Sequence, residues 1–132
     1  MKRMMIFTVA LLLLLTAIVL PVAEARAAIM DASGYCYISH TGKTVTFSGY
    51  TVSTDDEDII RVTITLQEKR DGTWYGITSR TKTEQNSDLA STTKDYTVSG
   101  GHYYRTVANH YYKTGNTSRS FSTHTNSVWI PE

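Results

Sequence analysis

The sequence predicts an all-β protein, an antiparallel β-sandwich of about seven strands, and three observations support this prediction. The 105 residues from Ala28 to Glu132 include 19 Thr, 12 Ser and nine Tyr. Thr and Tyr favour half-buried pleated surfaces, whereas Ser favours turns. Apolar residues also alternate with polar ones at a period of two, and turn signals separate these runs at short intervals. Such a chain forms one domain, with a small closed barrel as the alternative to the sandwich.

The clearest strand spans residues 60–68, whose alternate apolar side chains are expected to face inward. We expect the opposing sheet to supply Phe47, Tyr104 and Ala108 as their core partners. Asp71-Gly72 supplies the positive φ angles of a tight hairpin turn. The polar segment 84–91 is expected to be the longest connection. Further strands are expected at residues 34–40, 43–52, 73–83, 93–98, 102–112, 117–124 and 127–130.

Two glycine-containing segments and one irregular spacing complete the strand assignment. Gly100-Gly101 and Thr114-Gly115-Asn116 are expected to turn the chain on either side of the strand 102–112. Trp74 and Ile77 are three residues apart, so simple alternation cannot bury both. Either a β-bulge re-aims one of these side chains or one of them lies outside.

The N-terminal segment has the three-part layout of a secretory signal peptide. Lys2 and Arg3 precede an apolar stretch of 17 residues from position 4 to 20. Small-residue A-x-A sites follow Pro21, which predicts a signal peptide over residues 1–27, cleaved near Ala25 or Ala27. A retained membrane anchor is the alternative, since this length is at the lower edge of what spans a bilayer. We therefore expect a secreted, extracellular domain over residues 28–132 with no stable membrane anchor after cleavage.

Charge and cysteine content exclude several classes of protein. The chain has 13 Lys+Arg and 12 Asp+Glu, and ten of these bases and eleven acids follow residue 27, so the expected domain has a charge near −1. This balance gives no electrostatic footprint for nucleic acid or an anionic membrane, and we expect no nucleic-acid partner. A single cysteine cannot form an internal disulfide framework or a Cys-based zinc site.

Four fragments carry a resemblance to a known family. They are T-I-T-L-Q before an x-D-G-T-W hairpin, G-G-H-Y-Y-R, A-N-H, and S-F-S-T-H-T-N-S-V-W-I-P. In this order, over about residues 34–131, the chain resembles small secreted domains of unknown function from Gram-positive bacteria. The resemblance implies an immunoglobulin-like or fibronectin-III-like β-sandwich, and it carries no catalytic residues. It also implies a hydrogen bond from Tyr104, or from Tyr103, back to the preceding corner. The chain departs from antibody-type domains because it lacks paired cysteines with a core tryptophan.

No residue pattern in the sequence predicts catalysis or a cofactor. Cys36 with a histidine could form a nucleophile–base pair, but no catalytic signature surrounds this cysteine. A packing role for Cys36 is therefore the preferred interpretation. The alternative is a disulfide between Cys36 and a cysteine of another molecule. His102 and His110 share a strand face, but about 26 Å of strand separates them, too far for one ion. Four consecutive acidic residues are weak candidates for calcium binding, although a solvated turn is preferred. They are Asp55, Asp56, Glu57 and Asp58.

Aromatic residues at outward strand positions are the remaining functional signal. Exposed Tyr and Trp beside arginine are typical of protein interfaces and also stack on sugar rings. The candidates for a binding surface are Tyr75, Tyr103, Arg105, Tyr111 and Trp129. We therefore expect a non-catalytic extracellular binding or interaction module, whose partner is a protein or a cell-surface glycan. The alternative is a secreted effector or antimicrobial-type protein that acts on other cells.

Overall fold

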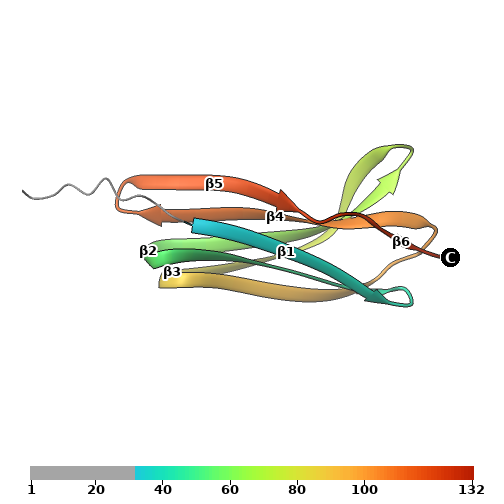
Figure 1. Cartoon of the computed structure of the whole chain (residues 1–132), viewed down its shortest axis with the longest axis horizontal. Helices are drawn as coiled ribbons and strands as arrows, with labels where there is room; N and C mark the ends of the chain where they lie inside the picture. The colour runs from blue at the N-terminus through green and yellow to red at the C-terminus, as the bar shows by residue number, and fades with distance from the viewer. Residues whose placement is uncertain (1–31) are drawn as a thin grey trace, which may run out of the picture.

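The computed structural model describes residues 32–132, which form an antiparallel all-β fold (Figure 1). The predicted signal peptide, residues 1–27, lies outside the described residues. In residues 32–132 no helix is long and apolar enough to cross a membrane. The strands are β1 (Ala32–Thr41), β2 (Thr44–Arg70), β3 (Thr73–Thr97), β4 (His102–Thr114), β5 (Thr117–His124) and β6 (Val128–Ile130).

Two long strands, β2 and β3, bend and take part in both layers of a sandwich. The first half of β2 pairs with β1 on one side and with residues 89–97 of β3 on the other. These segments form the three-stranded sheet. The second half of β2 pairs with residues 73–85 of β3 and with β4, and the far edge of β4 pairs with β5 and then β6. These segments form the four-stranded sheet, with β5 and β6 in line as one interrupted edge. The predicted antiparallel sandwich is confirmed.

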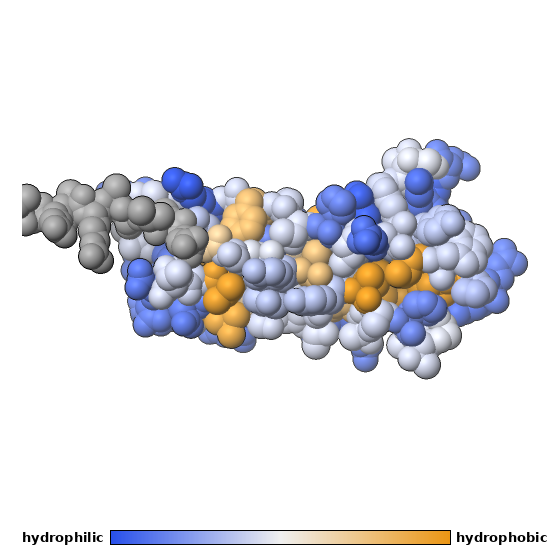
Figure 2. All heavy atoms as spheres, in the orientation of Figure 1, coloured by the Kyte–Doolittle hydropathy of each residue, from blue (hydrophilic) through white to orange (hydrophobic). Residues whose placement is uncertain are grey.

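The two sheets remain open at the side where β1 and β5 are edge strands. No ladder joins β1 to β5 in the described part of the chain, so the strands do not close into a barrel. Cys36 and Ile38 of β1, Phe121 of β5 and Val128 of β6 are half-buried against the core at this side. Figure 2 shows hydrophobic residues reaching the surface beside β1, toward β5 and β6. We call this side the open seam.

The bends in β2 and β3 correct two predictions. Residues 84–91 are not a connection, because β3 runs through them, and Gln85 and Ser87 pair with Ile59 and Glu57. The acidic run is likewise part of β2, at a register irregularity between Val52 and Glu57. The period-two pattern reports burial of one face. Near the bends most side chains are exposed, so the pattern is absent although the backbone ladder continues.

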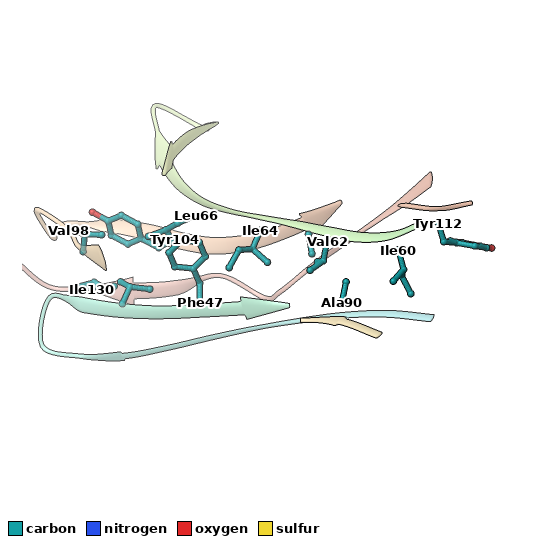
Figure 3. Packing of buried hydrophobic residues seen from close by; sticks show 12 residues of the cluster. Phe47, Ile60, Val62, Ile64, Leu66, Ala90, Val98, Tyr104, Tyr112 and Ile130 are labelled. Atoms are coloured by element: carbon teal, nitrogen blue, oxygen red, sulfur yellow. The ribbon is translucent and has the colours of Figure 1, made fainter. Parts of the chain in front are cut away.

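The core lies between the two sheets (Figure 3). Val62, Ile64 and Leu66 are fully buried, as predicted, and so is Phe47 of the opposing sheet. One part of the prediction is wrong: Tyr104 and Ala108 belong to β4, which is the neighbour of the second half of β2 in the same sheet. They flank the predicted strand instead of facing it, because β2 bends between its two halves and supplies a strand to each layer.

The predicted turns occupy the left-handed region of backbone conformation. Asp71 and Gly72 have φ angles of 50° and 80°, and Gly115 has a φ of 58°. Gly100 has a φ of 78°, and a Cβ there would lie 2.2 Å from the Pro131 carbonyl oxygen. Only glycine satisfies both constraints at that corner.

Tyr104 follows the same corner, near the start of β4. Its side chain is fully buried, and its hydroxyl donates to Glu68 Oε2 at 3.0 Å. The hydroxyl also interacts with Ser99 and with the Gly100 backbone, and burial raises the pKa of Tyr104. In the immunoglobulin constant-type arrangement the fourth strand joins the sheet of the first, second and fifth. Here the fourth segment, residues 73–85, instead pairs with the third segment of the chain.

Candidate functional site

Aromatic and cationic side chains gather at one end of the outer face of the four-stranded sheet. Trp129 of β6 is the register partner of Tyr103 of β4, and their ring centroids lie 5.0 Å apart at an angle of 62°. Lys69 of β2 is the register partner of Trp74 of β3. The β2–β4 ladder ends one residue before Lys69, at the Glu68–Tyr104 pair. Register therefore fixes two pairs at this end of the sheet, Trp129 with Tyr103 and Lys69 with Trp74.

Arg105 of β4 connects these two pairs. Its guanidinium lies 4.4 Å from the Trp74 ring centroid, and its Nε donates to Gln67 Oε1 at 2.8 Å. Lys69 Nζ also lies over the Trp74 ring, at 5.7 Å. Cation–π contacts of this kind fix the orientation of both partners. We call Trp74, Tyr103, Trp129, Lys69 and Arg105 the aromatic platform.

A β-bulge places Trp74 on this face. The register between β2 and β3 slips by one residue between Leu66 and Gln67, and Ile77 is the extra residue on β3. Ile77 therefore turns toward the core, while Trp74 points outward. The three-residue spacing of Trp74 and Ile77 predicted either a bulge or one side chain outside, and the structure shows a bulge together with Trp74 on the outside.

The structure brings together three of the five residues predicted for a binding surface. Tyr103, Arg105 and Trp129 belong to the aromatic platform. Tyr111 lies on the same outer face but eight residues along β4 from Tyr103, roughly 26 Å at about 3.3 Å per residue. There Arg61 lies over its ring at 4.9 Å.

Tyr75 lies apart from the aromatic platform, on the β2–β3 hairpin that projects from the body (Figure 1). It neighbours Trp74 in the chain and therefore points to the opposite side of the strand, where Arg70 lies 5.4 Å from its ring. Sequence reasoning missed Trp74 and Lys69. A signal for Trp74 was present in its spacing from Ile77, whereas the position of Lys69 depends on cross-strand register.

A second aromatic group lies on the outer face of the three-stranded sheet. Tyr50 stacks between two tyrosines of β1, with ring centroids 4.9 Å from Tyr35 and 6.3 Å from Tyr37. A hydrogen bond with Tyr37 raises the pKa of Tyr50 above its usual value. Val52 and Leu89, a register pair, extend this apolar surface. Arginine and lysine are absent from the outward positions of these strands in the described chain.

Cys36 and His110 belong to one polar cluster at the open seam. His110 Nδ1 lies 2.8 Å from Thr51 Oγ1, and its Nε2 lies 2.8 Å from Thr123 Oγ1. Thr51 donates its own proton to the Arg61 carbonyl at 2.9 Å. We therefore assign the imidazole proton to Nδ1, which leaves Nε2 to accept from Thr123. Cys36 Sγ lies 3.5 Å from the same Thr123 hydroxyl.

This cluster has the properties of a structural network. His110 is 1% exposed, and burial lowers its pKa from 6.5 to about 4. Phe121 stacks on the ring at 4.7 Å, and a Cβ on Gly34 would lie 2.4 Å from Nε2. A general base works best with a pKa near the working pH and with access to substrate. A buried imidazole of such low pKa, with both nitrogens hydrogen-bonded, instead links β1, β2, β4 and β5.

The acidic run fastens the bend of β2 to the β4–β5 hairpin. Glu57 is 5% exposed and accepts hydrogen bonds from Ser53 and Thr114. Asp58 accepts the backbone N–H of Gly115 at 2.7 Å, while Asp55 and Asp56 are exposed. Within residues 32–132 no group of three or more His, Cys, Asp or Glu side chains is placed to hold a metal ion.

Glu68 organises a charged cluster at the opposite end of the sandwich. It is 5% exposed, and its carboxylate accepts from Arg70 Nε at 2.5 Å and from the Tyr104 hydroxyl. His102 Nε2 lies 3.8 Å from the same carboxylate. Burial opposes ionisation of Glu68, but the hydrogen bonds from Arg70 and Tyr104 outweigh it and lower its pKa. The cluster joins the base of the β2–β3 hairpin to β4.

Comparisons with known proteins assign the chain to no family. No family model matches it, and no curated protein matches it. The solution structure of R. palustris CsgH is similar with a TM-score of 0.42 and 11% identity, over 70% of this chain and 90% of that one. The crystal structure of Spo0M, a sporulation control protein from Bacillus subtilis, has a TM-score of 0.46 and 12% identity. That match covers 79% of this chain and about half, 51%, of Spo0M. At these scores neither structure assigns a function to this chain.

Proposed function

We propose that this chain is a secreted, non-catalytic binding module whose ligand surface is the aromatic platform. The observation that carries the proposal is the grouping of these side chains on four strand segments: Trp129 contacts Tyr103, and Arg105 and Lys69 lie over Trp74. Trp129 is 49% exposed and Tyr103 is 47% exposed, while Trp74 is half-buried. Large rings that stay exposed on a rigid sheet can cover a partner at low cost in side-chain entropy.

The rest of the molecule supports a binding role over a catalytic one. His110, which shares Thr123 with Cys36, and Glu57 of the acidic run are both buried and form hydrogen bonds that join strands. Side chains on paired strands give a surface of defined geometry, and here β2 pairs with β3 at Lys69 and β4 pairs with β6 at Tyr103. Secretion rests on the predicted signal peptide. The immunoglobulin-like type and the resemblance to Gram-positive secreted domains are part of the same proposal.

The two tryptophans provide a direct test. The chain has only two, Trp74 and Trp129, and both belong to the aromatic platform. Ligand binding there should change the intrinsic tryptophan fluorescence of the purified protein during titration with cell-wall polysaccharides and cell-surface preparations. Tyr103→Ala should weaken binding at least about tenfold, the loss expected when a central interface anchor is truncated.

Tyr75→Ala is the matched control, because Tyr75 is also 47% exposed and lies off the platform. This variant should bind like the unaltered protein. Equal losses in Tyr103→Ala and Tyr75→Ala would show that the platform is not the ligand surface. A ligand that binds without a fluorescence change and with full affinity for Tyr103→Ala would lead to the same conclusion.

A further inference from the structure

The outer face of the four-stranded sheet carries cations and no carboxylates. In the register of β3, β2, β4 and β5, the outward positions include Arg61, Lys69, Arg105 and Lys113. No Asp or Glu occupies an outward position between residues 59 and 69 of β2, between 74 and 85 of β3, or along β4 and β5. We call this surface the basic face, and the aromatic platform forms one end of it.

The cations of the basic face have no acidic partners in residues 32–132. The ion pairs in that range join Arg70 and His102 to Glu68, and Lys82 to Glu84. Arg61 instead donates to Thr83 Oγ1 at 3.1 Å, and Arg105 donates to Gln67. A guanidinium group that is hydrogen-bonded to a neutral acceptor keeps its full positive charge. Its remaining N–H groups are available to donate to an anion.

The two ends of the basic face repeat one arrangement. At one end Arg105 and Lys69 lie over Trp74, and at the other end Arg61 lies over Tyr111. Arg61 and Lys69 are eight residues apart on β2, roughly 26 Å at about 3.3 Å per residue.

Hydroxyl and amide side chains form the surface between the two ends. Thr63 and Thr81 share a hydrogen bond of 2.8 Å, and Ser122 donates to Asn109 at 2.7 Å. Such groups can exchange these bonds for hydrogen bonds with the hydroxyls of a ligand. The basic face thus offers rings, positive charges and hydrogen-bonding groups in one plane.

We propose that the ligand of the basic face is an anionic polysaccharide, a sugar chain bearing carboxylate, sulfate or phosphate groups. This inference rests on the proposed binding function and adds the chemical class of the ligand. Trp129 and Tyr103 stack on sugar rings, Arg61 and Arg105 pair with the acidic groups, and the threonine and asparagine side chains bind ring hydroxyls. A polymer is favoured over a small anion because the two cation–aromatic ends are far apart.

A sparse anion fits better than a dense one. The expected domain has ten bases against eleven acids, so acids outnumber bases away from the basic face. Nucleic acid carries about one charge per 1.7 Å of duplex, and the remaining surface would repel it beyond the four cations. A polysaccharide with one charge per sugar unit or fewer places its anions at intervals that four cations can match.

The test compares one polymer in two charge states. Polygalacturonate carries a carboxylate on each sugar unit, and its methyl ester has the same backbone without the charge. Titration of the purified protein, followed by tryptophan fluorescence and by calorimetry, should show at least about tenfold tighter binding to polygalacturonate. Raising the salt from about 50 to 200 mM should weaken that binding about tenfold or more, because counterions are released when several cations engage a polyanion.

Charge-removing variants locate the effect. Arg61→Gln combined with Arg105→Gln should reduce binding to polygalacturonate to the level of the methyl ester. Arg119→Gln is the matched control, since Arg119 is an exposed cation of β5 that pairs opposite Tyr112 and faces away from the basic face. It should bind polygalacturonate with unchanged affinity.

The outcomes separate this inference from the proposed function. Equal affinity for polygalacturonate and its methyl ester, with binding still lost in Tyr103→Ala, would overturn the anionic ligand and retain the binding module. Tighter binding to single-stranded oligothymidylate than to polygalacturonate would overturn it in favour of nucleic acid. Binding to no polymer, with cell-surface preparations still bound and that binding lost in Tyr103→Ala, would also overturn the anionic polysaccharide and retain the binding module. Binding to neither polymers nor cell-surface preparations would overturn both.

Discussion

Substitutions at the contact between Gly49 and Ile64 test the packing of the two sheets at the centre of the sandwich. These residues lie on the two halves of β2, which belong to different sheets. A Cβ on Gly49 would lie 2.8 Å from Ile64 Cγ2, 3.1 Å from the Tyr35 carbonyl oxygen and 3.3 Å from Ala108 Cβ. The closest of these contacts is a methyl group that a second substitution can remove. The two changes should therefore compensate for each other.

The expected free energies of unfolding follow from this geometry. Gly49→Ala forces a methyl group into a filled core and should cost about 1–3 kcal/mol. Ile64→Ala removes a fully buried side chain and should cost roughly 2–5 kcal/mol. In the double variant the new methyl occupies space that Ile64 has left. It should therefore lose at least about 1 kcal/mol less than the sum of the single losses, within the range of contacting pairs.

Equilibrium unfolding in urea measures all four proteins of this cycle, provided that their m-values agree. Thr65→Ala is the control, because Thr65 faces outward beside Ile64 and should change stability by no more than about 0.5 kcal/mol. Additive losses in the double variant would refute the contact between the two halves of β2. An Ile64→Ala protein as stable as the unaltered one would refute the core assignment itself, and equal losses for Ile64→Ala and Thr65→Ala would mean that both faces are buried.

Two further predictions concern buried polar groups. Burial lowers the pKa of His110 from 6.5 to about 4, so on acidification the unfolded chain binds a proton at this histidine before the folded protein does. The contribution of His110 to the free energy of unfolding should therefore be complete above about pH 6.5. It should fall by up to roughly 3 kcal/mol as the pH approaches 4. Urea midpoints between pH 7 and 4.5 measure this slope, which should persist in His124→Gln and flatten in His110→Gln. Tyr104→Phe removes the hydroxyl that donates to Glu68 at 3.0 Å and should cost about 1–3 kcal/mol by thermal unfolding, and a loss below about 0.5 kcal/mol would contradict this role.

The sequence was informative wherever one strand face is buried and the other is not. Residues 60–68 alternate because β2 has the core on one side there, and each predicted inward residue is buried. The Asp71-Gly72 turn was likewise predictable, since few residues accept its φ angles. Residues 84–91 gave no such pattern because most of their side chains are exposed at the bend of β3. Only the ladder with residues 57–60 and 50–52 of β2 shows that they form a strand.

The candidate site was partly predictable for a related reason. Outward aromatics such as Tyr103 could be found from alternation, but their neighbours depend on register between strands distant in sequence. Trp129 reaches Tyr103 because the chain leaves β5 and pairs again with the first residues of β4. Arg105 of β4 reaches the Trp74 ring because β4 pairs with β2, in a ladder whose partners lie more than 30 residues apart. No local pattern encodes those pairings.

Net charge illustrates the same limit in electrostatics. A sum of ten bases and eleven acids describes the average over the whole domain. A ligand on one face instead responds to charges within about one Debye length, 8–10 Å at ordinary salt. Arg61, Lys69, Arg105 and Lys113 share one face without a carboxylate among its outward positions, whereas Asp55, Asp56 and Asp58 lie at the bend of β2. Net charge from composition therefore determines the electrostatic field only far from the molecule. A bound ligand experiences the field of one face, and this field depends on which residues the alternation of the strand places on that face.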